Sequence, residues 1–130
     1  MTPSKKHRVL VVDDDEDFSR ILQITLERAG YAVETAANGA EGLRSFQARR
    51  PDIALVDVNM PVIDGLEMCR RIRALEDGRR VPLILITVRS HLEIVTEGLR
   101  AGATDYILKP FAPDDLLARV SRALDACRKE

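Results

Sequence analysis

The residues in this sequence that are best suited to chemistry are acids, one hydroxyl and one ammonium, each placed directly after a short segment that is mostly apolar. In sequence order they are Asp13 and Asp14 after residues 8–12, Asp57 after 53–56, Thr87 after 82–86 and Lys109 after 104–108. Carboxylates that are brought together repel one another unless a cation lies among them. The single ammonium of Lys109 does not balance three acids. We therefore expect a hard divalent cation wherever these residues converge.

The cation that these groups favour is Mg2+. All of the candidate ligands are oxygens, and no histidine or cysteine accompanies them, which argues against zinc. In proteins Mg2+ is typically held by one or two carboxylates, with water and phosphate oxygens completing its shell. The neighbouring acids Asp15, Glu16 and Asp17 need no such explanation, because acids are ordinary in the first turn of a helix.

The elements that must position these residues alternate between strand and helix five times. Within the segment 8–12, residues 9–12 form a continuous apolar run, which is typical of a strand buried on both faces. Apolar residues at helical spacing follow in 17–29, and Gly30 indicates the end of that helix. The predicted strands are 8–12, 32–35, 53–56, 82–86 and 104–108. The predicted helices begin near Asp17, Asn38, Asp64, Ser90 and Pro113, and the third extends to Gly78.

Five such units predict the α/β class, with a doubly wound five-stranded parallel sheet, right-handed crossovers and five helices on its two faces. Ligands of such sheets bind outside the carboxyl ends of the strands. The acids, Thr87 and Lys109 should therefore meet at one edge of the molecule. The length of 130 residues suits a single domain over 1–130, with a core at about 8–127.

Composition narrows the setting of this domain. A net charge of −1, from 20 basic and 21 acidic residues, gives no basic stripe and predicts no direct binding to nucleic acid. No apolar run approaches the ~18 residues of a membrane span, and the polar residues 1–8 do not indicate a secretory signal. The isolated Cys69 and Cys127 favour a reduced, cytoplasmic protein. The arginines at 70, 71, 73, 79 and 80 are expected to coat a solvated helix face.

The motifs at the strand ends resemble those of the response-regulator receiver domain of two-component signalling, a family that includes single-domain chemotaxis regulators. They are Val-Val-Asp-Asp-Asp at 11–15, Asp-Val-Asn-Met-Pro at 57–61, Asp-Gly at 64–65, Ile-Thr at 86–87 and Asp-Tyr-Ile-Leu-Lys-Pro-Phe at 105–111. The resemblance covers about residues 8–127, and its specificity comes from five motifs in the right order. It implies a flavodoxin-like sheet with the strand order 2-1-3-4-5.

The resemblance implies how the acids would act. Asp57 would take the phosphoryl group from the phosphohistidine of a histidine kinase and become an acyl phosphate. Asp14 would bind Mg2+ directly and Asp13 would bind it through water. Asp57 and the backbone carbonyl of Asn59 would complete the protein ligands. Such a domain catalyses its own phosphorylation and dephosphorylation but is not a turnover enzyme.

The resemblance also implies a conformational switch. Lys109 would pair with Asp57 at rest and with a phosphoryl oxygen afterwards, and Thr87 would donate its hydroxyl to another phosphoryl oxygen. Tyr106 would change rotamer together with Thr87, and Lys109–Pro110 would be a cis peptide. The surface that changes would be the fourth helix, the fifth strand and the fifth helix.

The partners implied are a sensor histidine kinase or phosphotransfer protein, and either a downstream protein or an output domain outside this sequence. Self-association as a homodimer stays open, through the surface of the fourth and fifth helices or through that of the first and fifth.

Three other interpretations compete with this one. A flavodoxin-like electron carrier would need a phosphate-binding loop after the first strand, where the acidic residues 13–17 would repel the flavin phosphate. A phosphatase with an aspartate nucleophile would need a second acid two residues later, where Asn59 stands. A receiver-like binding module without phosphorylation is disfavoured by the complete set of acids, Thr87 and Lys109.

The two residues that follow Thr87, Val88 and Arg89, are expected to affect access to the site. Val88 stands where a smaller alanine or glycine is usual, and its stiff branched side chain should hinder small donors and water at the mouth of the site. Arg89 would either lie over the phosphoryl oxygens or point into solvent. Gly98, inside the fourth helix, costs that helix about 1 kcal/mol relative to alanine.

Overall fold

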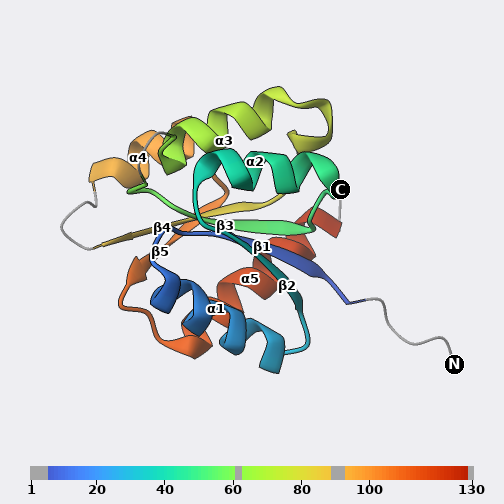
Figure 1. Ribbon diagram of the computed structural model, residues 1–130, viewed down its shortest axis with the longest axis vertical. Helices are drawn as coiled ribbons and strands as arrows, with labels where there is room; N and C mark the ends of the chain where they lie inside the picture. Colours follow the sequence, from blue (N-terminus) through green and yellow to red (C-terminus); the bar gives the residue numbers. More distant parts are fainter. Residues whose placement is uncertain (1–5, 61–62, 89–92, 129–130) are drawn as a thin grey trace, which may run out of the picture.

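The computed structural model describes residues 6–60, 63–88 and 93–128. Within these ranges, five parallel strands form one sheet in the order β2-β1-β3-β4-β5, with helices on both faces (Figure 1). The strands are β1 (Arg8–Val12), β2 (Ala32–Ala36), β3 (Ile53–Asp57), β4 (Leu83–Val88) and β5 (Asp105–Lys109). The helices are α1 (Glu16–Arg28), α2 (Gly39–Ala48), α3 (Gly65–Ala74), α4 (Glu93–Arg100) and α5 (Pro113–Arg128), with a short 3-10 turn η1 (Glu76–Gly78). The predicted fold class and strand order are confirmed.

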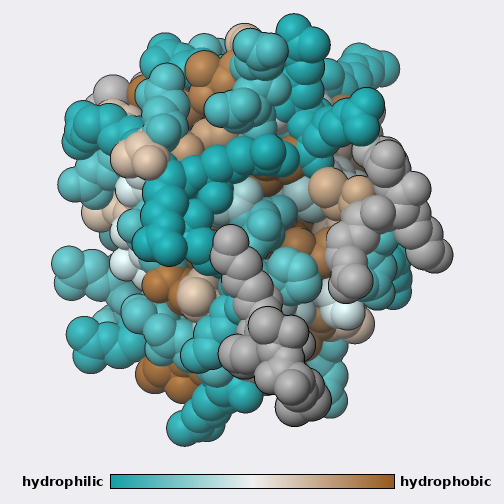
Figure 2. Space-filling view, turned by 90° about the vertical axis from the view of Figure 1, so that its right-hand side faces the viewer, coloured by the Kyte–Doolittle hydropathy of each residue, from teal (hydrophilic) through white to brown (hydrophobic). Residues whose placement is uncertain are grey.

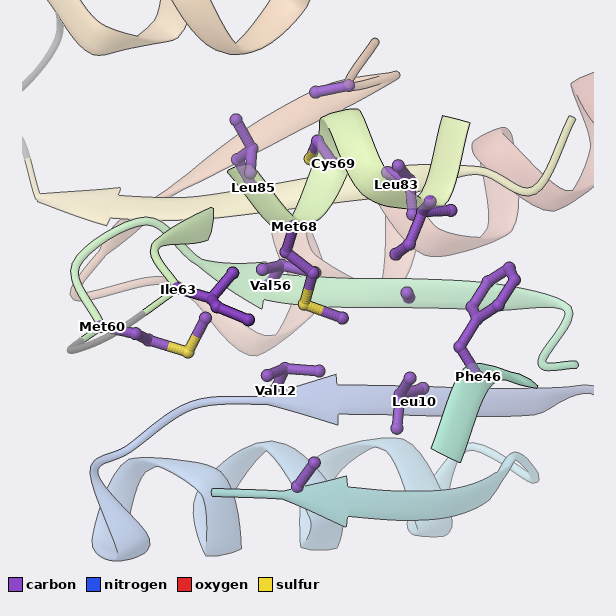
Figure 3. Packing of buried hydrophobic residues seen from close by; sticks show 14 of the residues in the cluster. Leu10, Val12, Phe46, Val56, Met60, Ile63, Met68, Cys69, Leu83 and Leu85 are labelled. Atoms are coloured by element: carbon purple, nitrogen blue, oxygen red, sulfur yellow. The ribbon is translucent and has the colours of Figure 1, made fainter. Parts of the chain in front are cut away.

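The three central strands, β1, β3 and β4, are buried on both faces, which explains their continuous apolar runs. Helices α1 and α5 cover one face, and α2, α3 and α4 cover the other (Figure 1). Successive residues of a strand point to opposite faces. Val9 and Val11 of β1 therefore pack under α1 and α5, whereas Leu10 and Val12 pack under α2 and α3. Figure 3 shows this second core, in which Met68 of α3 lies over β1 and β3.

Side-chain caps begin the helices where the sequence predicts them. Asn38 and Asp64 each accept a hydrogen bond from the backbone N–H three residues on, at 2.9 and 2.8 Å. Helix α1 begins one residue earlier than predicted, because the side chain of Asp15 caps it. The cap predicted at Ser90 lies outside the described residues.

Two boundaries differ from the prediction by more than one residue. Helix α3 ends at Ala74 and not at Gly78, because Leu75 is extended and the chain continues as the turn η1. Strand β4 extends to Val88, two residues beyond the predicted end, so that Thr87 lies inside the strand. These last residues of β4 pair with β5. Pairing with a strand about 20 residues away in sequence is not visible in a local pattern.

Arg73 does not belong to the solvated arginine face that the sequence suggested, although residues 70, 71, 79 and 80 are exposed. Its guanidinium is half-buried and donates to the carbonyl oxygens of Gly102, Gly78 and Val81 at 2.9, 2.8 and 2.6 Å. These carbonyls belong to the segments that precede β5 and β4. Arg73 thereby fixes the end of α3 to the amino-terminal ends of two strands.

Arg73→Lys is expected to lower the free energy of unfolding by about 2 kcal/mol, because a single ammonium cannot reproduce the planar fork that reaches three carbonyls. Urea unfolding measures this loss. The matched control is Arg71→Lys, on the same helix but exposed and paired with Glu67 at 3.0 Å, which should change stability by less than about 0.5 kcal/mol. Equal effects of the two variants would contradict the assignment.

The end of the molecule at which the strands begin has a mostly hydrophilic surface where Figure 2 shows described residues. Among the helices of the described ranges, none combines the length and the apolar character needed to span a membrane.

Candidate functional site at the carboxyl ends of the strands

The carboxyl ends of four strands bring the predicted site residues together, at the left of Figure 1. Asp13 follows β1, while Asp57 and Lys109 are the last residues of β3 and β5. Thr87 lies near the end of β4, paired in register with Leu108. Because parallel strands end at the same edge of a sheet, residues far apart in sequence become neighbours there.

Three carboxylates and one ammonium form the centre of this site. Asp13, Asp14 and Asp57 each place a carboxylate oxygen within 4.8 Å of the others. Asp13 and Asp57 are 2% and 5% exposed, whereas Asp14 is exposed. The Nζ atom of Lys109 lies 3.2 Å from Oδ2 of Asp13 and 3.6 Å from Oδ2 of Asp57. The ammonium of Lys109 thus forms ion pairs with two buried carboxylates.

The electrostatics of the site make Asp57 difficult to ionise. Its burial, and then the nearby carboxylate of Asp13, raise the pKa of Asp57 from 3.8 to about 6. The ammonium of Lys109 and the backbone N–H of Asn59, which donates to Oδ1 at 3.3 Å, act in the opposite direction but do not cancel the effect. Negative charge in this pocket is therefore only partly neutralised by the protein itself.

The donor set is suited to a hard divalent cation. Oδ2 of Asp13 is buried and accepts no hydrogen bond in the described part of the chain, although it lies near Lys109. A buried carboxylate oxygen normally has such a partner or a metal ion. The three acids bring carboxylate oxygens close together, and Mg2+ in proteins is typically held by one or two carboxylates together with water and phosphate oxygens.

The other predicted residues surround this centre. Asn59 follows β3 and is exposed. Its backbone N–H donates to the side chain of Asp57. The buried hydroxyl of Thr87 donates to the backbone carbonyl of Val88 at 3.5 Å, a weak contact that leaves it able to change partner. Val88 is half-buried and paired with Lys109 at the strand ends. Arg89 lies outside the described residues.

Tyr106 lies on the same face of the sheet as Thr87. In register it pairs with Leu85, two residues before Thr87, so side-chain alternation places both on the face covered by α3 and α4. The guanidinium of Arg119 lies 5.5 Å from the Tyr106 ring centroid and pairs with Asp105 at 2.9 Å. The peptide Lys109–Pro110 is cis, as the resemblance implied.

Sequence reasoning missed one residue of this site. Phe18 reads as part of the apolar stripe of the first helix, yet its ring centroid lies 4.1 Å from the Nζ atom of Lys109. The two residues are far apart in sequence and carry no shared motif. Only the tertiary structure, which brings the start of α1 to the carboxyl end of β5, reveals the contact.

Comparison with known proteins identifies the family. Residues 9–121 match the model of the response regulator receiver domain. The transcriptional regulatory protein CseB of Streptomyces coelicolor is 47% identical over 116 residues, which cover 89% of this chain and 48% of CseB. PrrA of Mycobacterium tuberculosis is 44% identical over 117 residues, covering 90% of this chain and 49% of PrrA. The chain spans about half the length of the curated relatives that it matches.

Solved structures agree with this comparison. The chemotaxis response regulator CheY4 of Vibrio cholerae is 38% identical, with a TM-score of 0.87 over 92% of this chain and 99% of that one. The receiver domain of the sensor histidine kinase PA1611 from Pseudomonas aeruginosa is 34% identical, with a TM-score of 0.86 over 93% and 99% of the two chains. That structure holds a magnesium ion in its active-site cleft.

The chain belongs to the response-regulator receiver family of two-component signalling. Members of this family act as signalling domains and not as turnover enzymes, which excludes the flavodoxin and phosphatase interpretations.

Proposed function

We propose that this domain accepts a phosphoryl group on Asp57 and changes conformation in response. A carboxylate oxygen of Asp57 forms the bond to phosphorus as the phosphorus–nitrogen bond of a phosphohistidine breaks, and the electron pair leaves with the imidazole. The observation that carries this proposal is the place of Asp57 at the end of β3, within reach of Asp13, Asp14 and Lys109.

Asp13, Asp14 and Asp57, with the backbone carbonyl of Asn59, are the proposed ligands of Mg2+. When bound, the metal supplies positive charge beside the transferring phosphoryl group. The magnesium ion in the cleft of the PA1611 receiver domain supports this assignment. The protein itself supplies Lys109, whose ammonium is proposed to pair with one phosphoryl oxygen, and Thr87, whose hydroxyl is proposed to donate to another.

Labelling with a small donor tests the proposal. Acetyl phosphate should give one acyl phosphate per chain in the presence of Mg2+, and peptide mapping after borohydride reduction should place it at Asp57. Chelation of the metal and Asp57→Asn should each abolish the label. Asp17→Asn, an exposed acid in the first turn of α1, is the matched control and should be labelled like the wild type. Undiminished labelling of Asp57→Asn would refute the assignment.

Val88→Ala is expected to speed both the formation and the loss of the acyl phosphate, because Val88 ends β4 beside Lys109 and we propose that its methyl groups narrow the mouth of the site. Mass spectrometry of phosphorylated protein over time measures both rates. Ile24→Ala in α1, a large exposed apolar side chain outside the proposed site, provides the control. Equal lifetimes of the wild type and Val88→Ala would show that this side chain does not limit access.

The wider role follows from the family. We propose that residues 1–130 form one domain, with its core at about 8–127, that acts in the cytoplasm. It would receive its phosphoryl group from a histidine kinase or phosphotransfer protein and would act on a downstream protein or output domain. The lengths of CseB and PrrA, about twice that of this chain, support an output domain. The surface of α4, β5 and α5, which contains Tyr106, is the proposed signalling surface.

A further inference from the structure

The ammonium of Lys109 has an aromatic neighbour as well as two acidic ones. Its Nζ atom lies 4.1 Å from the ring centroid of Phe18, and 3.2 and 3.6 Å from carboxylate oxygens of Asp13 and Asp57. A cation at this distance from a ring centroid is attracted by the negative face of the ring. The lysine side chain is 19% exposed, so water screens this attraction only in part. The ammonium is therefore bound by a ring and two acids together.

The position of Phe18 is fixed by the same segment that supplies Asp13. Oδ1 of Asp13 accepts a hydrogen bond from the backbone N–H of Asp15 at 2.9 Å. The side chain of Asp15 in turn accepts from the backbone N–H of Phe18 at 3.2 Å as it caps α1. The acid and the ring that contact Lys109 thus belong to one hydrogen-bonded turn.

A second ring, from the loop between β5 and α5, supports the first. Phe111, two residues after Lys109, packs edge-on against Phe18, with ring centroids 5.4 Å apart and an interplanar angle of 85°. Edge-to-face packing is a favoured arrangement for aromatic pairs. The segment that carries Lys109 thereby helps to orient the ring that Lys109 contacts.

We propose that Phe18 is a positioning residue for phosphoryl transfer, which rests on the function proposed above for Asp57. The ring face keeps the ammonium of Lys109 beside Asp57, where it can pair with an oxygen of the arriving phosphoryl group. A lysine side chain is long and flexible, and without the ring its ammonium would spend more time in solvent. Phe18 forms no bond to the phosphoryl group and exchanges no proton.

The first test separates the electronic effect of the ring from its shape. Phenylalanines with one, two or three fluorines, introduced at position 18 alone, withdraw electrons from the ring face with little change in size. The rate of labelling by acetyl phosphate at saturating Mg2+ should fall stepwise with each fluorine, and Phe18→Leu should be slower than wild type by roughly three- to tenfold. Phe18→Tyr, which keeps the ring face, should restore the rate to near the wild-type value.

The matched control is the same fluorine series at Phe46, a residue of α2 that is buried in the core on the opposite face of the sheet. There the labelling rate should not change with fluorine number. A flat series at position 18, or a wild-type rate in Phe18→Leu, would overturn the proposal. A series at Phe46 with the same slope would overturn it too, since the effect would then come from altered packing.

The second test does not depend on phosphorylation, and so distinguishes failure of this inference from failure of the proposed function. In unphosphorylated protein, the ring current of Phe18 should shift the ε-methylene resonances of Lys109 upfield. The shift should disappear in Phe18→Leu and persist in Phe18→Tyr. Ordinary lysine resonances in the wild type would show that the contact is absent and would refute the proposal, whether or not Asp57 is labelled.

Discussion

In metal-free buffer at pH 7, the free energy of unfolding of Asp57→Asn is expected to exceed that of the wild type by about 2 kcal/mol. Urea unfolding measures the difference. The pKa of Asp57 is raised to about 6 in the folded protein, chiefly by burial and then by Asp13, from an ordinary value of 3.8. The folded state therefore binds this proton more tightly than the unfolded state does. Wild-type stability should fall as the pH rises from about 4 to about 6, and asparagine removes that loss.

The pH and the metal provide the controls for this prediction. The advantage of Asp57→Asn should shrink as the pH falls from about 6 towards about 4, because the wild-type carboxyl then becomes protonated in the folded state, and it should vanish below the ordinary pKa of 3.8, where both states are protonated. Asp14→Asn, which changes an exposed carboxylate, should change the free energy of unfolding less than Asp57→Asn does. Addition of Mg2+ should stabilise the wild type more than Asp57→Asn, because a ligand that binds the folded state alone adds to stability. Parallel pH profiles of the wild type and Asp57→Asn would contradict the prediction.

Gly65→Ala is expected to lower the free energy of unfolding by about 3 kcal/mol and to slow phosphorylation of Asp57 by tenfold or more. Gly65 is the buried first residue of α3, and its backbone N–H donates to the carbonyl of Val58 at 3.0 Å. A Cβ atom there would lie 2.5 Å from the carbonyl oxygen of Asp57 and 2.8 Å from Cα of Val58. Both neighbours are backbone atoms that cannot move without moving the phosphorylation site.

Gly98→Ala is the matched control for this effect. It also adds a methyl group at a buried helical glycine, but the methyl would meet Cδ1 of Leu85, the end of a flexible side chain. The gain in helix propensity, about 1 kcal/mol, offsets part of the repacking. Stability should therefore change by no more than about 1 kcal/mol, with phosphorylation near the wild-type rate. Similar losses in stability and rate for Gly65→Ala and Gly98→Ala would show that contact with the backbone of β3 is not the cause.

The local pattern of the sequence predicts the class of fold, because the positions that each strand or helix buries must be apolar. A strand covered on both faces must be apolar at every position, and helices at the surface must repeat their apolar residues at helical spacing. Those patterns give the alternation of strands and helices, and the strand ends give Asp13, Asp57, Thr87 and Lys109. The boundaries near Gly78 and Val88 were less accurate, because the extended backbone of Leu75 ends α3 early and because β4 is lengthened by pairing with β5, about 20 residues away in sequence.

By itself, then, the sequence determined which chemical groups the site contains and which edge of the sheet carries them. The tertiary structure decided how those groups affect one another. The raised pKa of Asp57, the sharing of Lys109 between two acids, and the ring of Phe18 against its ammonium all depend on distances between different elements. Residue type and order specify a donor or a charge, but its energy depends on burial and on neighbours that only the packed chain brings within a few ångströms.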